Sequence, residues 1–89
     1  MNANARKLAI VTGASSGIGY ELAKRCAAEG FDLLIAADQP AIEQAAHEFR
    51  ESGVSVDAVQ TDLATLEGVD ELYAAIRSRP VDALLANAG

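Results

Sequence analysis

The 89-residue chain is 51% hydrophobic and 22% charged, with a formal net charge of -6, a balance that is typical of one globular domain and excludes a disordered or membrane-spanning chain. Its acidity argues against nucleic-acid and anionic-membrane partners, because both bind clustered lysines and arginines. The lone Cys26 excludes an intrachain disulfide or a cysteine zinc site, and no apolar run suits a signal peptide or membrane span, so we expect a metal-free cytoplasmic protein.

The first predicted strand is a continuous apolar run over Lys7–Thr12, which is typical of a strand buried on both faces. After a cluster of glycines and serines a helix begins, with Ser15 or Ser16 as its N-cap and Gly30 as the residue that ends it. We expect one face of this helix to be buried, formed by Ile18, Leu22 and Cys26, with Ala23 and Ala27 beside them.

The same alternation continues to the end of the chain. A second strand is predicted over Asp32–Ala37, and Pro40 suits the first position of the helix that follows. The apolar stripe of that helix is Ile42, Ala45, Ala46 and Phe49. A third strand over Val54–Thr61 precedes a helix that opens at Thr65, and a fourth strand covers Val81–Ala86. The apolar face of the third helix is Val69, Leu72, Tyr73 and Ile76.

Strands that alternate with single helices pair in parallel through right-handed crossovers. The pattern therefore predicts an α/β fold, half of a doubly wound parallel sheet with strand order 3-2-1-4. In that order the outer edge of the fourth strand has no partner. We therefore expect the chain to be either a fragment truncated after the fourth strand or a piece that is completed by a second chain. Association of identical chains into a homo-oligomer is also expected.

The segment Thr12–Gly19 (TGASSGIG) joins the first strand to the first helix, where backbone N–H groups and the positive end of a helix face one spot. Gly13 allows the tight turn, Gly17 lets the backbone approach a pyrophosphate, and Gly19 lets the helix pack close to the strand. Hydroxyl groups come from Thr12, Ser15 and Ser16. The loop is therefore predicted to hold two linked phosphates.

Asp38 follows Gly19 by 19 positions, at the end of the second strand. An acid at this distance accepts hydrogen bonds from the adenosine ribose of a dinucleotide. A carboxylate there would also repel a 2′-phosphate, so the sequence favours NAD as the cofactor over NADP.

Three segments together resemble the N-terminal signatures of the short-chain dehydrogenases/reductases: Thr12–Gly19, Asp62–Leu63 and Asn87–Gly89. The resemblance implies a Rossmann-type fold in which residues 1–89 form the N-terminal part of an NAD(P)-binding domain. It also implies that Asp62 and Leu63 flank the adenine ring, while Asn87 braces the central strand and lines the groove with the residues after it. The predicted cofactor-binding residues are Gly13, Ser15, Ser16, Gly17, Ile18, Gly19, Asp38, Asp62, Leu63, Asn87, Ala88 and Gly89.

Members of this family transfer hydride at an alcohol or carbonyl carbon, using a serine, a tyrosine and a lysine that follow the fifth strand. The resemblance implies that the parent protein is an NAD(P)-dependent oxidoreductase acting on a small alcohol or carbonyl compound. We expect this chain to supply the cofactor-binding half without catalytic residues and to be inactive alone. The alternative is a dinucleotide-binding module or complementing subunit with no chemistry of its own.

Two local patterns imitate catalytic signatures. Tyr20 and Lys24 match Tyr-x-x-x-Lys, but they lie in the first helix, so we interpret them as packing and surface residues. Gly13–Gly17 matches the Gly-x-Ser-x-Gly of hydrolases, but the only histidine, His47, lies mid-helix without an acid to complete a triad. The helical carboxylates are interpreted as solubilising charge: Glu43, Glu48, Glu51, Asp70 and Glu71.

Overall fold

The computed structural model describes residues 7–15, 17–77 and 79–85. Strands and helices alternate as predicted, in the order β1 (Leu8–Thr12), α1 (Gly17–Ala28), β2 (Asp32–Ala37), α2 (Ala41–Arg50), β3 (Val56–Gln60), α3 (Leu66–Ile76) and β4 (Ala83–Leu85). The third and fourth strands are shorter than predicted, because pairing with their neighbours begins only at Val56 and Ala83. Within these residues, no helix is long and apolar enough to span a bilayer.

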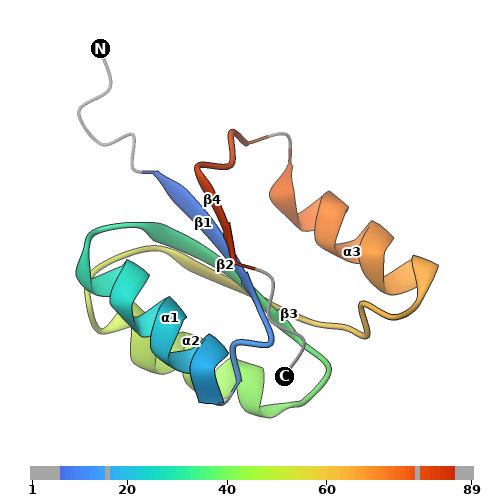
Figure 1. Cartoon of the computed structure of the whole chain (residues 1–89), viewed down its shortest axis with the longest axis horizontal. Coiled ribbons are helices and arrows are strands. Elements are labelled where there is room, and N and C mark those ends of the chain that lie inside the picture. The colour runs from blue at the N-terminus through green and yellow to red at the C-terminus, as the bar shows by residue number, and fades with distance from the viewer. Residues whose placement is uncertain (1–6, 16, 78, 86–89) are drawn as a thin grey trace.

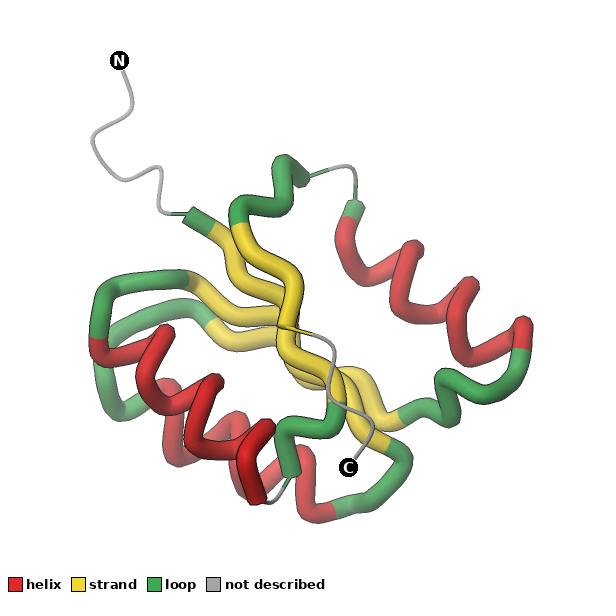
Figure 2. Tube along the Cα trace, in the orientation of Figure 1, coloured by secondary structure: helices red, strands yellow, loops and turns green. Residues whose placement is uncertain are grey.

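The described strands form one parallel sheet in the order β3-β2-β1-β4. This order confirms the predicted α/β, Rossmann-type architecture. The pairing of β1 with β2 runs from Leu8 opposite Asp32 to Thr12 opposite Ala36. Figures 1 and 2 show α1 and α2 on one face of the sheet and α3 on the other.

Alternate residues of β1 enter two different cores, because successive side chains of a strand point to opposite faces. Ala9 and Val11 belong to the larger core, which packs under α1 and α2 and contains Phe49. Leu8 and Ile10 belong to the smaller core beneath α3. The face under α3 is therefore the less densely covered one.

Helix α1 buries only part of the face that was predicted: Ala23 and Ala27 are buried, but Ile18 and Leu22 are not. Its buried residues are Gly19, Ala23 and Ala27. Cys26 is half buried, whereas Ile18 is 71% and Leu22 36% exposed. The prediction for Ile18 and Leu22 was therefore wrong: glycine and alanine let the helix backbone approach the sheet closely, and the bulky side chains stay outside.

The other two helices agree more closely with the sequence. All four residues of the predicted α2 stripe are buried. Pro40 is the N-cap of α2 and not its first residue. The third helix begins at Thr65 as predicted, and Thr65 is its N-cap, because its side chain accepts a hydrogen bond from the Gly68 N–H. Tyr73 was predicted to pack with the apolar face of α3, but it is 70% exposed.

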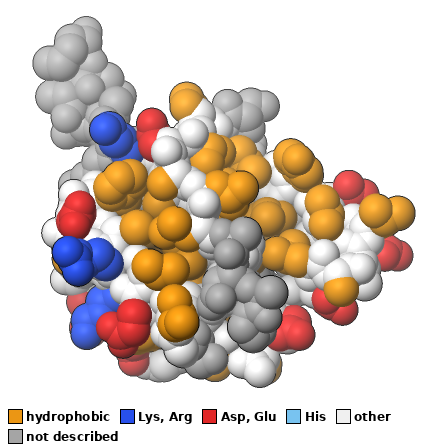
Figure 3. Space-filling model, in the orientation of Figure 1, with side chains coloured by type: hydrophobic (Ala, Val, Ile, Leu, Met, Phe, Trp, Pro, Cys, Tyr) orange, Lys and Arg blue, Asp and Glu red, His pale blue; other side chains and the backbone are white. Residues whose placement is uncertain are grey.

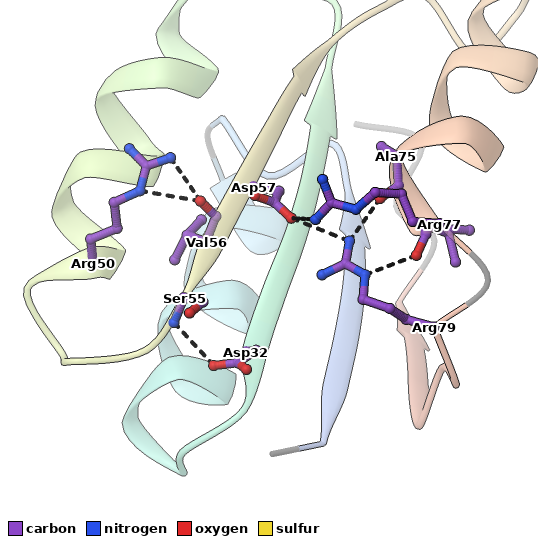
Figure 4. Close-up of polar contacts among 9 residues, drawn as sticks. Asp32, Arg50, Ser55, Val56, Asp57, Ala75, Arg77 and Arg79 are labelled. Atoms are coloured by element: carbon purple, nitrogen blue, oxygen red, sulfur yellow. Dashed lines mark hydrogen bonds and ion pairs between the residues drawn. The ribbon is translucent and has the colours of Figure 1, made fainter. Parts of the chain in front are cut away.

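Arg50 lies beside the outer edge of β3, whereas Arg77 and Arg79 bind Asp57 on the α3 side of the sheet (Figure 4). Arg50 donates from Nε and Nη2 to the Val56 carbonyl oxygen, at 3.1 and 2.7 Å. Asp57 forms ion pairs with Arg77 at 3.3 Å and with Arg79 at 3.2 Å. Because an exposed strand edge invites further pairing, the contact of Arg50 with the Val56 carbonyl protects β3 from adding another strand.

The opposite edge of the sheet is apolar. As predicted, β4 is the end strand of the sheet in the part of the chain described, and Leu84 is 63% exposed. Figure 3 shows hydrophobic side chains over this region and over the neighbouring parts of α1 and α3. The sheet thus has one polar, protected edge and one open, apolar edge.

Candidate functional site

A groove of about 960 Å³ lies at the carboxyl ends of β1, β2 and β3 and continues between α3 and the sheet. Its polar end is lined by Gly13, Ser15, Asp38, Gln39 and Asp62, and its apolar end by Leu72, Tyr73, Ile76 and Leu84. No described lysine or arginine lines it. Ligands of open α/β sheets bind in the crevice at this end of the strands, which makes the groove the candidate site.

The groove brings together several of the residues predicted to bind the cofactor. Those that line it are Gly13, Ser15, Asp38, Asp62 and Leu63. Gly17 and Ile18 line a second hollow on the outer side of α1, and Gly19 is buried. The remaining predicted residues lie outside the described part of the chain: Ser16, Asn87, Ala88 and Gly89.

Two glycines of the turn have backbone conformations that favour glycine, and open space lies beside one of them. Gly13 and Gly17 have φ values of 65° and 63°, which favour glycine over other residues. The Gly13 N–H donates to the Ala36 carbonyl oxygen at 2.7 Å, which ties the turn to β2. A Cβ on Gly17 would meet no atom within 4 Å. Open space therefore lies beside the first residue of α1, where the helix dipole favours an anion.

A side-chain hydrogen bond links this turn to the loop after β2. Ser15 Oγ donates to Gln39 Oε1 at 3.2 Å. Ser15 was one of two predicted caps for α1, but the structure shows its hydroxyl bonded to Gln39. Gln39 was not predicted as a site residue; its position directly after Asp38 was the only signal in the sequence.

The corner after β3 forms the third part of the polar end. The Thr61 N–H donates to the Ala37 carbonyl oxygen at 2.9 Å, which joins the ends of β3 and β2. Thr61 Oγ1 donates to Glu71 Oε1 at 2.7 Å, and Asp62 Oδ1 accepts from the Ala64 N–H at 2.9 Å. The interpretation of Glu71 as solubilising charge alone was wrong, because its carboxylate binds a buried threonine. The corner is held in place by these contacts.

Tyr20, one half of the catalytic look-alike, lies outside the groove. Its hydroxyl donates to the Glu48 carboxylate of α2, and its ring centroid lies 5.1 Å from that of Phe49. The hydrogen bond to Glu48 raises the pKa of Tyr20, whereas a tyrosine acting as acid or base near neutral pH needs a lowered pKa. Tyr20 thus has a packing role, and Glu48 does more than solubilise the helix.

The hydrolase alternative is not supported by the arrangement of the groove. His47 is exposed on α2. It is not among the residues that line the groove with Ser15. Ser15 therefore has no histidine to activate it, and the serine belongs with the turn.

Comparison with known proteins places the chain in a family. The family model described as short chain dehydrogenase matches residues 7–89. A fatty acyl-CoA reductase from Acinetobacter baylyi is 38% identical over 86 residues, which are 93% of this chain and 29% of that protein. The L-sorbose reductase of Gluconobacter frateurii, solved with NADPH and L-sorbose, matches with a TM-score of 0.89 at 40% identity. That match covers 96% of this chain and 34% of that one.

A second solved structure gives the same result. A variant of actinorhodin polyketide ketoreductase with NADPH matches with a TM-score of 0.87 and 37% identity, over 100% of this chain and 35% of that one. The chain spans about a third of the length of the proteins that it matches. The family match over almost the whole sequence agrees with the strand order and with the glycine turn. The chain belongs to the short-chain dehydrogenase family.

Proposed function

We propose that this chain forms the adenosine-binding part of an NAD(P)-dependent oxidoreductase that acts on an alcohol or carbonyl compound. One observation carries the proposal: a single groove joins the glycine turn to the carboxylates of Asp38 and Asp62 at the ends of adjacent strands. The reductase names of its relatives and the NADPH in its structural neighbours support it. When bound, the nicotinamide ring supplies hydride transfer.

The residues at the polar end fit the parts of such a cofactor. Backbone N–H groups at the start of α1 would hold the pyrophosphate, with Gly17 leaving room for it. Asp38 would face the adenosine ribose. Asp62 uses Oδ1 to accept from Ala64, so its second carboxylate oxygen can accept from the adenine amino group, while Leu63 contacts the ring.

The preference for NAD that Asp38 predicted is not supported, because the structural neighbours hold NADPH and favour NADP. Asp38 lies one position beyond Ala37, the last residue of β2, and is exposed. We therefore propose NADP as the cofactor. The described lining includes Tyr73 but no lysine, so the chain alone should bind the cofactor without turning it over.

Cellular location and assembly stay predictions. The cytoplasmic location rests on the lone Cys26 in the sequence. Association with further copies or with a second chain rests on the open edge of β4.

Calorimetric titration of the chain with NADP and NAD, with thermal unfolding as a second readout, tests the proposal. Ligand at 100 times its Kd should raise the free energy of unfolding by about 2.7 kcal/mol. Gly17→Val places a side chain in the space left for the phosphates and should abolish the effect. Gly30→Val is the matched control, because Gly30 also has positive φ and open surroundings but lies at the far end of α1. Equal binding by Gly17→Val and Gly30→Val would refute the proposed loop.

A further inference from the structure

One side chain of α3 supports the corner after β3 from behind. Thr61 Oγ1 donates to Glu71 Oε1 at 2.7 Å. Thr61 is 7% exposed and lines the groove. Glu71 is exposed and is not among the lining residues. Glu71 therefore holds the wall of the groove from its outer side.

The backbone of this corner is anchored by separate contacts. The Thr61 N–H donates to the Ala37 carbonyl oxygen at 2.9 Å. The Asp62 carbonyl oxygen accepts from the Thr65 N–H at 3.2 Å and from Thr65 Oγ1 at 2.9 Å. Glu71 adds a contact from the second turn of α3 to the Thr61 side chain. A hydrogen bond to an ionised carboxylate is stronger than one between neutral groups, so this contact restrains the residue that precedes Asp62.

We propose that Glu71 is a positioning residue for the adenine end of the groove: by holding Thr61, it fixes the direction in which the adjacent Asp62 carboxylate faces a purine base. The inference rests on the proposed function and deepens it, because it names the residue that sets the choice of base. An ionised carboxylate only accepts hydrogen bonds. A fixed Asp62 therefore favours a base with an amino group over one with an oxygen at the same place, whereas a carboxylate that turns freely discriminates less.

Two nucleotides isolate this discrimination. 5′-AMP and 5′-IMP share the ribose phosphate and differ at one ring position, which carries an amino group in AMP and an oxygen in IMP. Their Kd values are measured by calorimetry, and the ratio cancels any change in the fraction of folded chain, because both bind the same folded state. We expect the wild-type chain to bind AMP about tenfold more tightly than IMP, the effect of one hydrogen bond to a charged group. Glu71→Ala should lower this ratio to about twofold.

Glu67→Ala is the matched control. It removes the same charge from an exposed position of α3 that does not line the groove, so the ratio should stay at the wild-type value. Glu71→Gln keeps an oxygen that accepts from Thr61 and should retain most of the discrimination. Circular dichroism of each variant verifies that it is folded.

Thr61→Val tests the other partner of the hydrogen bond. Valine keeps the shape of the buried side chain but removes the donor, so the ratio should fall as far as in Glu71→Ala. If the two residues act as one unit, the double variant Thr61→Val with Glu71→Ala should show no further fall. Additive falls in the double variant would overturn the inference, because Glu71 would then act independently of Thr61.

The remaining outcomes separate the inference from the function on which it rests. A wild-type ratio in Glu71→Ala overturns the inference, even if both nucleotides bind more weakly, because Glu71 then has a structural role alone. An equal fall in Glu67→Ala, or a wild-type chain that binds AMP and IMP equally tightly, also overturns it. In all these cases the proposed function stands. A wild-type chain that binds no adenine nucleotide or dinucleotide overturns both.

Discussion

Gly68 lies where the first turn of α3 meets the corner after β3, and Gly68→Ala tests how closely the two are packed. A Cβ here would overlap the Asp62 carbonyl oxygen and would lie 2.6 Å from the Asp62 carbonyl carbon and 2.9 Å from Thr61 Oγ1. A carbon–oxygen contact needs about 3.3 Å. Two of the three atoms are backbone atoms, which cannot escape by changing rotamer. Either the helix or the corner must therefore move.

Two effects of opposite sign determine the stability of this variant. Alanine in a helix is favoured over glycine by roughly 1 kcal/mol. Overpacking costs about 1–3 kcal/mol, and overlap with backbone belongs at the upper end of that range. We expect the free energy of unfolding to fall by about 2 kcal/mol, which lowers the Tm by roughly 10 °C for a chain of this size.

Urea and thermal unfolding followed by circular dichroism measure the effect. Ala74→Gly is the control, because Ala74 is exposed on the same helix, and it should cost roughly 1 kcal/mol from propensity alone. The corner also carries Asp62 and Leu63, so Gly68→Ala should raise the Kd for 5′-AMP. A Gly68→Ala chain as stable as wild type would refute the close packing of α3.

Three further changes test other contacts. Asp38→Arg replaces a repelling carboxylate by a guanidinium and should strengthen NADP relative to NAD about tenfold in calorimetry; an unchanged ratio would mean that Asp38 does not face the ribose. The hydrogen bond from Tyr20 lowers the pKa of Glu48, so its stabilising effect holds above the ordinary glutamate pKa and is lost as the pH falls through the lowered value. Tyr20→Phe should flatten the acid side of a plot of Tm against pH, and a curve parallel to wild type would contradict this. Arg50→Leu removes the hydrogen-bond donor to the Val56 carbonyl. It should lower the free energy of unfolding by about 1 kcal/mol and should increase light scattering from aggregates. A variant with the wild-type free energy of unfolding and wild-type light scattering would contradict the protection of this edge.

Local patterns in the sequence were sufficient for the order and type of the elements. Continuous apolar runs predicted the strands, and β2 has the predicted bounds. The stripe of α2, the Thr65 cap and the positive φ of Gly30 also follow from short-range rules. Each strand is joined to the next by a single helix, and such crossovers are right-handed. Few strand orders are compatible with this rule, so the parallel sheet and its order could be predicted.

The candidate site was predictable where a residue belongs to a sequence motif or lies at a fixed spacing from one. Gly13 and Asp38 were found from their spacing, and the groove contains both. Gln39 and Glu71 were missed, because each acts through a partner distant in the sequence. Ser15 is 24 positions from Gln39, and Thr61 is 10 positions from Glu71. A polar side chain of this kind has no local signature.

Sequence alone determined which segments are strands and helices, where the chain turns, and which loop has the backbone freedom to approach a phosphate. Tertiary structure decided which side of α1 is buried, since periodicity identifies apolar stripes but not which of two adjacent stripes meets the sheet. The stripe of glycine and alanine is the buried one, because small side chains allow the closest approach of helix and sheet. It also decided that Ser15 meets Gln39 across the groove, since that contact exists only once β1 and β2 lie beside each other.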